Sequence, residues 1–156
     1  MKSKMTAFLP FEEEIPDELA KLIGLIVIRC GQLERVLMNV YHRTLEPDSN
    51  LLDVIAKLRQ DQKPLGGRIS QLEAEFNKRN FPVPSWLDFT SLKELAEKRN
   101  AIHDALITDE NGAFGWLSGS HKRSHRSVDL PSLQDFLKRL RAMLSQLTVD
   151  AISQKP

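Results

Sequence analysis

The sequence predicts an all-α fold, an up-down bundle of four to five helices with a small hairpin or loop insertion before the last helix. Apolar residues recur at intervals of three and four over most of the chain, which is the period of an amphipathic helix. Proline, glycine and asparagine are concentrated in short stretches between these segments, where they mark turns. The chain has 156 residues, 41% of them hydrophobic, so we expect a single domain over residues 1–156 with a buried core.

The first predicted helix begins after an irregular arm, residues 1–15, and ends near Leu45. Pro16 suits the first turn of a helix, and Asp17 and Glu18 suit its electropositive N-terminal end. The repeat of apolar residues predicts one buried stripe along this helix. Its members are Leu19, Leu22, Ile23, Ile26, Val27, Cys30, Leu33, Leu37, Val40 and Tyr41.

The opposite face of this helix carries Gly24, Ile28 and Gly31. Glycine in a helix interior costs about 1 kcal/mol relative to alanine. The glycines either admit the close approach of another helix or are simply tolerated, and the sequence does not decide between these alternatives. Cys30 is the single cysteine; it falls on the core stripe, where we expect it to pack, and it fits a reducing compartment.

The middle of the chain predicts three more helices after a turn at residues 46–50. A short helix is expected over residues 51–59, where Leu51, Leu52, Ile55 and Leu58 would be buried, and a longer one over residues 64–78. The prolines in residues 79–84 end the longer helix, and Ser85 is the predicted N-cap of a helix that extends to about Leu106. The core face of that helix is predicted to contain Phe89, Leu92, Leu95, Ala96, Ile102 and Leu106.

Residues 109–130 are predicted to form a small hairpin or an ordered loop. Asp109-Glu110-Asn111-Gly112 is a tight-turn signal with apolar residues on both sides. The last helix is expected from near Pro131 to about Ile152, followed by a tail at residues 153–156.

A basic run lies inside this insertion, at residues 121–126. Lys122, Arg123 and Arg126 are candidate contacts to RNA phosphates, although a solvated loop is the commoner meaning of such a run. The histidines at 121 and 125 have no acidic or cysteine partner nearby, so we expect no metal site there. The chain also lacks a glycine-rich phosphate loop, and we expect no cofactor.

The balance of charge restricts the class of function. The net charge is +1, from 22 lysines and arginines against 21 acidic residues. That balance argues against a nucleic-acid coat protein and against a helical transcription regulator, while it leaves room for a local basic patch. No stretch is apolar for long enough to span a bilayer, and the first residues lack the apolar run of a signal peptide. We therefore expect a cytoplasmic protein without membrane contact.

Three polar side chains interrupt the predicted apolar faces. Arg99 and His103 lie one helical turn apart near the middle of one face, and Glu34 lies within the stripe of the first helix. Because an unpaired buried charge is costly, these residues form either a functional site or buried pairs. Glu34 either orients Arg99 or His103 or is the buried counter-ion of Arg99, and we favour the counter-ion.

The spacing of Arg99 and His103 suits phosphodiester cleavage, because side chains four residues apart on a helix lie within mutual reach. Histidine, with an ordinary pKa of about 6.5, can take a proton from a ribose 2′-hydroxyl or give one to the leaving oxygen. Arginine keeps its charge and presents a fork of donors to phosphate oxygens. Asn100 could bind a phosphate or orient the imidazole. Alternatively, Arg99 pairs with Glu34 and His103 donates to a backbone carbonyl.

The segment EKRNAIHDAL, residues 97–106, resembles the motif of the HEPN superfamily, in which an arginine, usually followed by asparagine, precedes a histidine by a few residues. The segment IGLIVIRCGQLERVL, residues 23–37, resembles the opening helix of small bacterial HEPN-like proteins. The order of the predicted elements also fits, over about residues 17–150. The resemblance implies a helical bundle that forms a homodimer, with the arginine and histidine of two protomers facing each other in a cleft at the interface.

Active members of this superfamily are metal-independent ribonucleases of toxin–antitoxin, abortive-infection and phage-defence systems. The resemblance therefore implies an endoribonuclease in which Arg99 contacts phosphate, His103 is the general acid and base and Asn100 is their polar companion. Only three residues separate Arg99 from His103, fewer than is usual in the superfamily. The alternative is a noncatalytic dimeric module that binds RNA or a protein partner such as an antitoxin. An Arg99 fully paired to Glu34 would favour that alternative.

Overall fold

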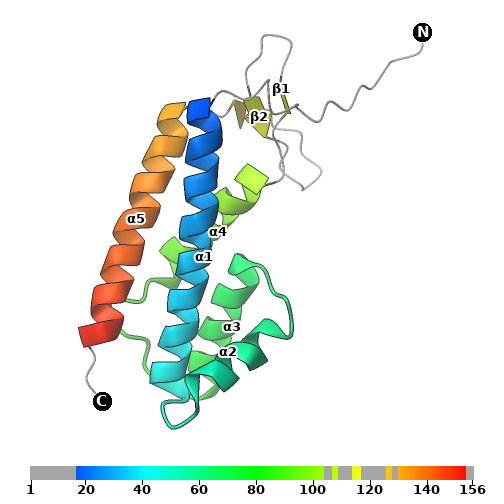
Figure 1. Cartoon of the computed structure of the whole chain (residues 1–156). Helices are drawn as coiled ribbons and strands as arrows, with labels where there is room; N and C mark the ends of the chain where they lie inside the picture. Colours follow the sequence, from blue (N-terminus) through cyan, green and yellow to red (C-terminus); the bar gives the residue numbers. More distant parts are fainter. Residues whose placement is uncertain (1–16, 104–106, 109–113, 117–125, 128–129, 154–156) are drawn as a thin grey trace.

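The computed structural model describes residues 17–103, 107–108, 114–116, 126–127 and 130–153, and over these residues the fold is an all-α helical bundle, as predicted (Figure 1). A small three-stranded sheet precedes the last helix. The elements are α1 (Asp17–Leu45), α2 (Leu51–Arg59), α3 (Leu65–Lys78), α4 (Phe89–His103), β1 (Ile107–Thr108), β2 (Phe114–Trp116), β3 (Arg126–Ser127) and α5 (Leu130–Ser153).

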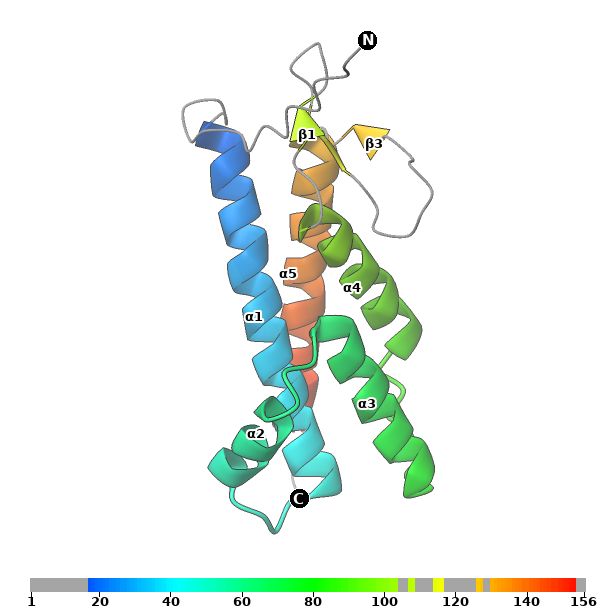
Figure 2. The same cartoon turned by 90° about the vertical axis from the view of Figure 1, so that its right-hand side faces the viewer.

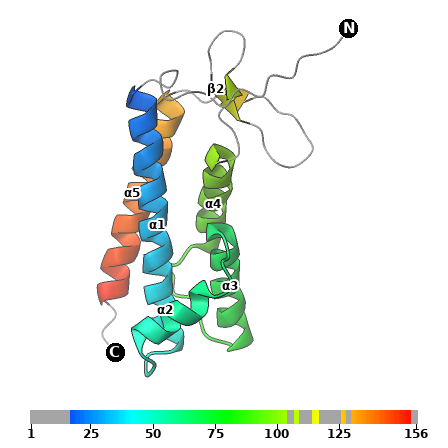
Figure 3. The ribbon, with the colours of Figure 1, turned by 45° about the vertical axis from the view of Figure 1, so that its right-hand side comes forward.

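The two longest helices, α1 and α5, make the most extensive contact in the bundle and begin at the same end of it (Figure 1). Helix α3 packs against α4 and α1, and α2 packs against α1 at the opposite end (Figure 2). Helix α4 runs back toward the end at which α1 and α5 begin, and it touches α1 over only a short stretch (Figure 3). The end of α4 that carries the predicted motif therefore lies where the bundle is least tightly closed.

The predicted boundaries agree with the structure to within one residue for α1, α2, α3 and α5, whereas the predicted start of α4 was wrong. Ser85 does not cap this helix, which begins at Phe89. The Asp88 side chain accepts a hydrogen bond from the Ser91 backbone N–H at 3.1 Å, and the Ser91 hydroxyl donates to Asp88 Oδ2 at 2.7 Å. Asp88 therefore satisfies the free N–H of the first turn. The predicted extension beyond His103 lies outside the described residues.

The predicted hairpin is confirmed, since Ile107 and Thr108 of β1 pair antiparallel with Gly115 and Phe114 of β2. The third strand, β3, pairs antiparallel with β2 and was not predicted. A strand of two residues is too short to produce a recognisable alternation of apolar and polar residues. The arm at residues 1–15 and the tail at 154–156 lie outside the described residues.

The core is formed by the predicted stripes, with a few corrections. Val27 was predicted to be buried but is 48% exposed, because it lies on the flank of α1 where α4 makes little contact. Leu52 was also predicted to be buried, yet it is 73% exposed, and Val54 faces α1 in its place. The side chains of α1 that are buried are Ile26, Cys30, Leu33, Leu37, Met38, Val40, Tyr41 and Leu45. Within the described residues, the helices contain no apolar stretch of the length and hydropathy that a membrane span requires.

Candidate active site on α4

Arg99 and His103 both lie on α4, four residues apart, so the helical backbone places them on neighbouring turns of one face. Arg99 is half-buried, and its Nη1 donates to the side-chain oxygen of the adjacent Asn100 at 3.2 Å. Arg99 and Asn100 are therefore in contact, while the predicted roles of Asn100, to bind a phosphate or to orient the imidazole, stay predictions. For His103 the backbone alone is described, and it occupies the last residue of the helix.

The predicted counter-ion of Arg99 is not present. Among the described residues, Glu34 and Arg99 do not come within the 4.0 Å of an ion pair, so the proposal of a direct buried salt bridge was wrong. The ion pair is absent because α4 packs mainly against α3 and contacts α1 over only a short stretch. Glu34 stays half-buried on α1 and keeps access to water.

Cys30 shows that the two charges nevertheless lie in one region. Burial raises the pKa of the Cys30 thiol to about 11, while the positive charge of Arg99 lowers it and the negative charge of Glu34 raises it. Cys30 is only 2% exposed. The thiol is therefore neutral at physiological pH and acts as a packing group, as predicted. Its environment places Arg99 of α4 and Glu34 of α1 within electrostatic range of the same buried atom.

Arg99 is half-buried, and among the described residues no carboxylate lies within ion-pair distance of its guanidinium. The guanidinium has five N–H donors, and the hydrogen bond to Asn100 uses one of them. An arginine with unused N–H donors can bind an anion such as a phosphate group through two hydrogen bonds.

The candidate RNA contacts in the insertion are only partly covered by the structure. Lys122 and Arg123 lie outside the described residues, and Arg126 is in β3, where its backbone pairs with Trp116. RNA binding by residues 121–126 therefore stays a prediction.

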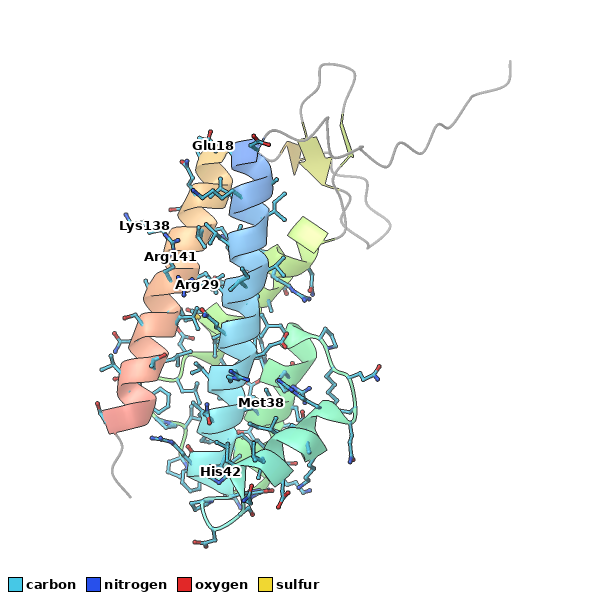
Figure 4. The ribbon with its side chains drawn as sticks, in the orientation of Figure 1. Glu18, Arg29, Met38, His42, Lys138 and Arg141 are labelled. Carbon is cyan, nitrogen blue, oxygen red and sulfur yellow. The ribbon has the colours of Figure 1, made fainter. Side chains whose placement is uncertain are left out.

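The structure shows a second group of cations that sequence reasoning missed. Arg29 of α1 and Lys138 and Arg141 of α5 lie at a similar level of this helix pair, and Lys138 extends away from α1 (Figure 4). Arg29 Nη1 donates to Gln32 Oε1 at 2.8 Å, and its Nε is buried without a hydrogen-bond partner. No acidic side chain of the described residues lies within ion-pair distance of these three cations. Their separation in sequence concealed the cluster, because only the parallel packing of α1 and α5 assembles it.

A groove of about 460 Å³ lies between α4 and α5, and neither Cys30 nor Arg99 lines it. It was also missed from the sequence, because its residues belong to the flanks of two separate apolar stripes. Lys98 and Arg139 line it together with Asp88 and Glu94. Its apolar lining consists of Trp86, Leu92, Leu95, Phe136, Met143 and Leu147.

Within the described part of the chain, no cluster of three or more histidine, cysteine, aspartate or glutamate residues is arranged to hold a metal ion. Comparisons of the chain with protein-family models, with curated proteins and with solved structures found no match.

Proposed function

We propose that this chain is a HEPN-like, metal-independent endoribonuclease whose catalytic residues are Arg99, His103 and Asn100. The observation that carries the proposal is the state of Arg99, which is half-buried, adjacent to the histidine in helical register and without a carboxylate partner in the described residues. A structural arginine in that position would need a counter-charge. The resemblance of residues 97–106 to the HEPN motif supplies the reaction class.

The proposed reaction uses the ribose of the RNA as its nucleophile. His103 removes the proton of a 2′-hydroxyl, and the 2′-oxygen forms a bond to the adjacent phosphorus. The bond from phosphorus to the 5′-oxygen breaks, which gives a cyclic 2′,3′-phosphate and a 5′-hydroxyl. The leaving 5′-oxygen takes a proton from an imidazolium, that of His103 or of its counterpart in a second protomer. Arg99 stabilises the charge that accumulates on the phosphoryl oxygens, and Asn100 fixes the orientation of Arg99.

The proposal includes a homodimer, an RNA substrate and a role in a toxin–antitoxin or phage-defence system with an antitoxin or another protein partner. The cations Arg29, Lys138 and Arg141 supply positive charge for RNA binding outside the reacting centre. Cleavage by this route needs no metal ion, so chelation leaves the reaction intact.

The test is incubation with total RNA in EDTA, with His103→Ala as the inactive comparison. The wild-type chain should cleave RNA to products ending in cyclic phosphate. His103→Ala should lower the rate by about 10²- to 10⁴-fold, the usual contribution of a general acid–base group. Lys138→Ala is the matched control, because it should weaken RNA binding and leave the maximal rate unchanged. Equal cleavage by wild type and His103→Ala would remove the proposal.

A second candidate function, a noncatalytic dimeric interaction module, is favoured by the outer face of α1. Val27 and Ile28 are 48% and 59% exposed there, and a Cβ added at Gly24 or Gly31 would meet no atom within 4 Å. A second protomer could approach this face closely. Ile28→Glu should then shift the chain from dimer to monomer in sedimentation, whereas Val149→Glu, at a residue of α5 that is 57% exposed, should not. A stable dimer without RNA cleavage would select this candidate.

A further inference from the structure

The groove between α4 and α5 combines an apolar floor with a charged end. Leu92, Leu95 and Phe136 are nearly buried at its base, while Trp86 and Met143 remain half-exposed along it. Its volume of about 460 Å³ lies within the range of sites that hold a ligand or a few side chains. An apolar hollow of this kind is suited to a short apolar segment.

The charges of the groove are separated along its length. Helix α4 runs toward the end of the bundle where α5 begins (Figures 1 and 2). By their order along the chain, Lys98 is therefore nearest that end, Glu94 is one turn behind it and Asp88 is farthest from it. On α5, Arg139 lies in the half of the helix nearer the same end. Within the described residues, Lys98 and Arg139 have no acidic partner within ion-pair distance. The occupant should therefore carry negative charge next to an apolar stretch, with the negative charge nearer the start of α1 and α5.

The sequence before α1 has this composition in this order. Leu9 and Phe11 flank Pro10, and three consecutive glutamates, residues 12–14, follow them. A residue before proline favours extended backbone, in which residues two apart share one face. Leu9 and Phe11 would then point to the same side, with Phe8 on the other.

The tether between the glutamates and α1 is long enough. Helix α1 begins at Asp17, at the end of the bundle where α5 also begins (Figure 1). Arg139 lies nine residues into α5, about 14 Å along the helix axis. The five residues from Glu12 to Asp17 span up to about 17 Å when extended. Glu12 can therefore reach the level of Arg139, and Leu9 and Phe11 can extend further along the groove.

We propose that the groove between α4 and α5 is the docking site of the chain's own N-terminal segment, with Leu9 and Phe11 against the apolar floor and residues 12–14 against Lys98 and Arg139. This contact covers the flank of the helix that carries Arg99 and His103. It fixes α4 against α5 on the side where α1 does not support it. The inference does not depend on ribonuclease activity.

Cysteine cross-linking tests the contact in the full-length chain with Cys30→Ala. Ala7→Cys, which shares the face of Leu9, is paired either with Gln146→Cys, which lines the groove, or with Ser145→Cys, the adjacent exposed residue of α5 that does not line it. Mild oxidation at low protein concentration should join residues 7 and 146 within one chain several-fold more efficiently than residues 7 and 145. Equal yields for the two pairs would overturn the proposal.

Two further variants separate the apolar and the electrostatic parts of the contact. Leu9→Ser with Phe11→Ser should reduce the yield of the cross-link to residue 146 to that of the control pair. Lys98→Glu with Arg139→Glu should also reduce it, and lysines at residues 12–14 should restore it in that charge-reversed background. A cross-link that forms only between chains would overturn the intrachain contact and assign the groove to the segment of a second copy. An unchanged yield in every variant would exclude a specific contact.

Discussion

Arg68 of α3 and Arg99 of α4 are both at least half-buried, yet their surroundings differ. Arg68 is 8% exposed, and its Nη1 contacts the carbonyl of Leu58, Asp61 Oδ1 at 3.2 Å and Gln71 Oε1 at 3.2 Å. Arg99 has one hydrogen bond from Nη1, to its own neighbour Asn100. Three acceptors of the fold hold the guanidinium of Arg68, whereas one acceptor, on the neighbouring residue, holds that of Arg99.

Arg79 extends the comparison to the lower end of the bundle. It donates to the carbonyl of Leu45 at 2.7 Å and to Glu46 Oε1 at 3.2 Å, and its guanidinium lies 5.9 Å from the centre of the Tyr41 ring. This arginine ties the turn after α1 to the end of α3. The guanidinium groups of Arg68 and Arg79 thus each contact a backbone carbonyl and a carboxylate. The contrast supports the proposed functional role of Arg99, while the contacts of Arg68 and Arg79 serve the fold.

The largest expected difference concerns stability. Arg68→Ala removes the donor to the Leu58 carbonyl and one of the two ion pairs of Asp61, and it should lower the free energy of unfolding by about 2–3 kcal/mol. Arg99→Ala removes no comparable network and should change it by less than about 0.5 kcal/mol. Urea denaturation of the two variants measures the difference. Equal losses would remove the distinction between the structural and the functional arginine.

Cys30 tests how closely Arg99 approaches α1. Because burial raises the thiol pKa from 9.0 to about 11, the unfolded chain loses the thiol proton first as pH rises. The stability contributed by the neutral thiol is complete below pH 9 and declines between about 9 and about 11, by at most about 3 kcal/mol. Cys30→Ala should abolish this part of the pH dependence. Arg99→Ala should shift the thiol pKa upward, and an unchanged thiol pKa would mean that Arg99 is remote from Cys30.

Gly31 tests the exposed face of α1. An alanine Cβ at this position would meet no atom within 4 Å, so Gly31→Ala should raise the stability of the monomer by about 0.4–1 kcal/mol through helix propensity. If the face forms a dimer interface, the same substitution should weaken the dimer in sedimentation experiments. Loss of monomer stability would contradict the open face seen here.

The smallest effect is expected at Glu34. Since this half-buried carboxylate forms no ion pair with Arg99, Glu34→Gln should change the free energy of unfolding by less than about 0.5 kcal/mol. Thermal unfolding of the variant is the measurement. A loss of several kcal/mol would restore the buried counter-ion that the sequence suggested and would argue against a free Arg99.

The helices could be predicted from the sequence because each has a continuous apolar stripe between turn residues, as in α2, which was predicted to the residue. The start of α4 could not, because Ser85 and Asp88 are both good capping residues and only the hydrogen bond from Ser91 decides between them. The positions of Arg99 and Asn100 followed from helical periodicity. The absence of an ion pair between Glu34 and Arg99 could not be predicted, because periodicity gives the face of a helix on which a residue lies and not the distance between two helices.

The cations of α1 and α5 illustrate the same limit. Arg29 and Arg141 are more than a hundred residues apart in sequence, and nothing local relates them. Their proximity depends on the parallel pairing of the two helices, which is a tertiary property. Val27 was mistaken for a core residue for a related reason, since its face of α1 is apolar in sequence but is left uncovered by α4.

The central claim is that the open guanidinium of Arg99 serves RNA phosphate. The most direct test is the rate of RNA cleavage by Arg99→Ala in EDTA, measured together with its melting temperature. The account predicts a loss of about 10²- to 10³-fold in rate, the usual effect of removing one donor that stabilises transition-state charge, at an unchanged melting temperature. Undiminished cleavage by Arg99→Ala, or an absence of cleavage by the wild-type chain, would contradict it.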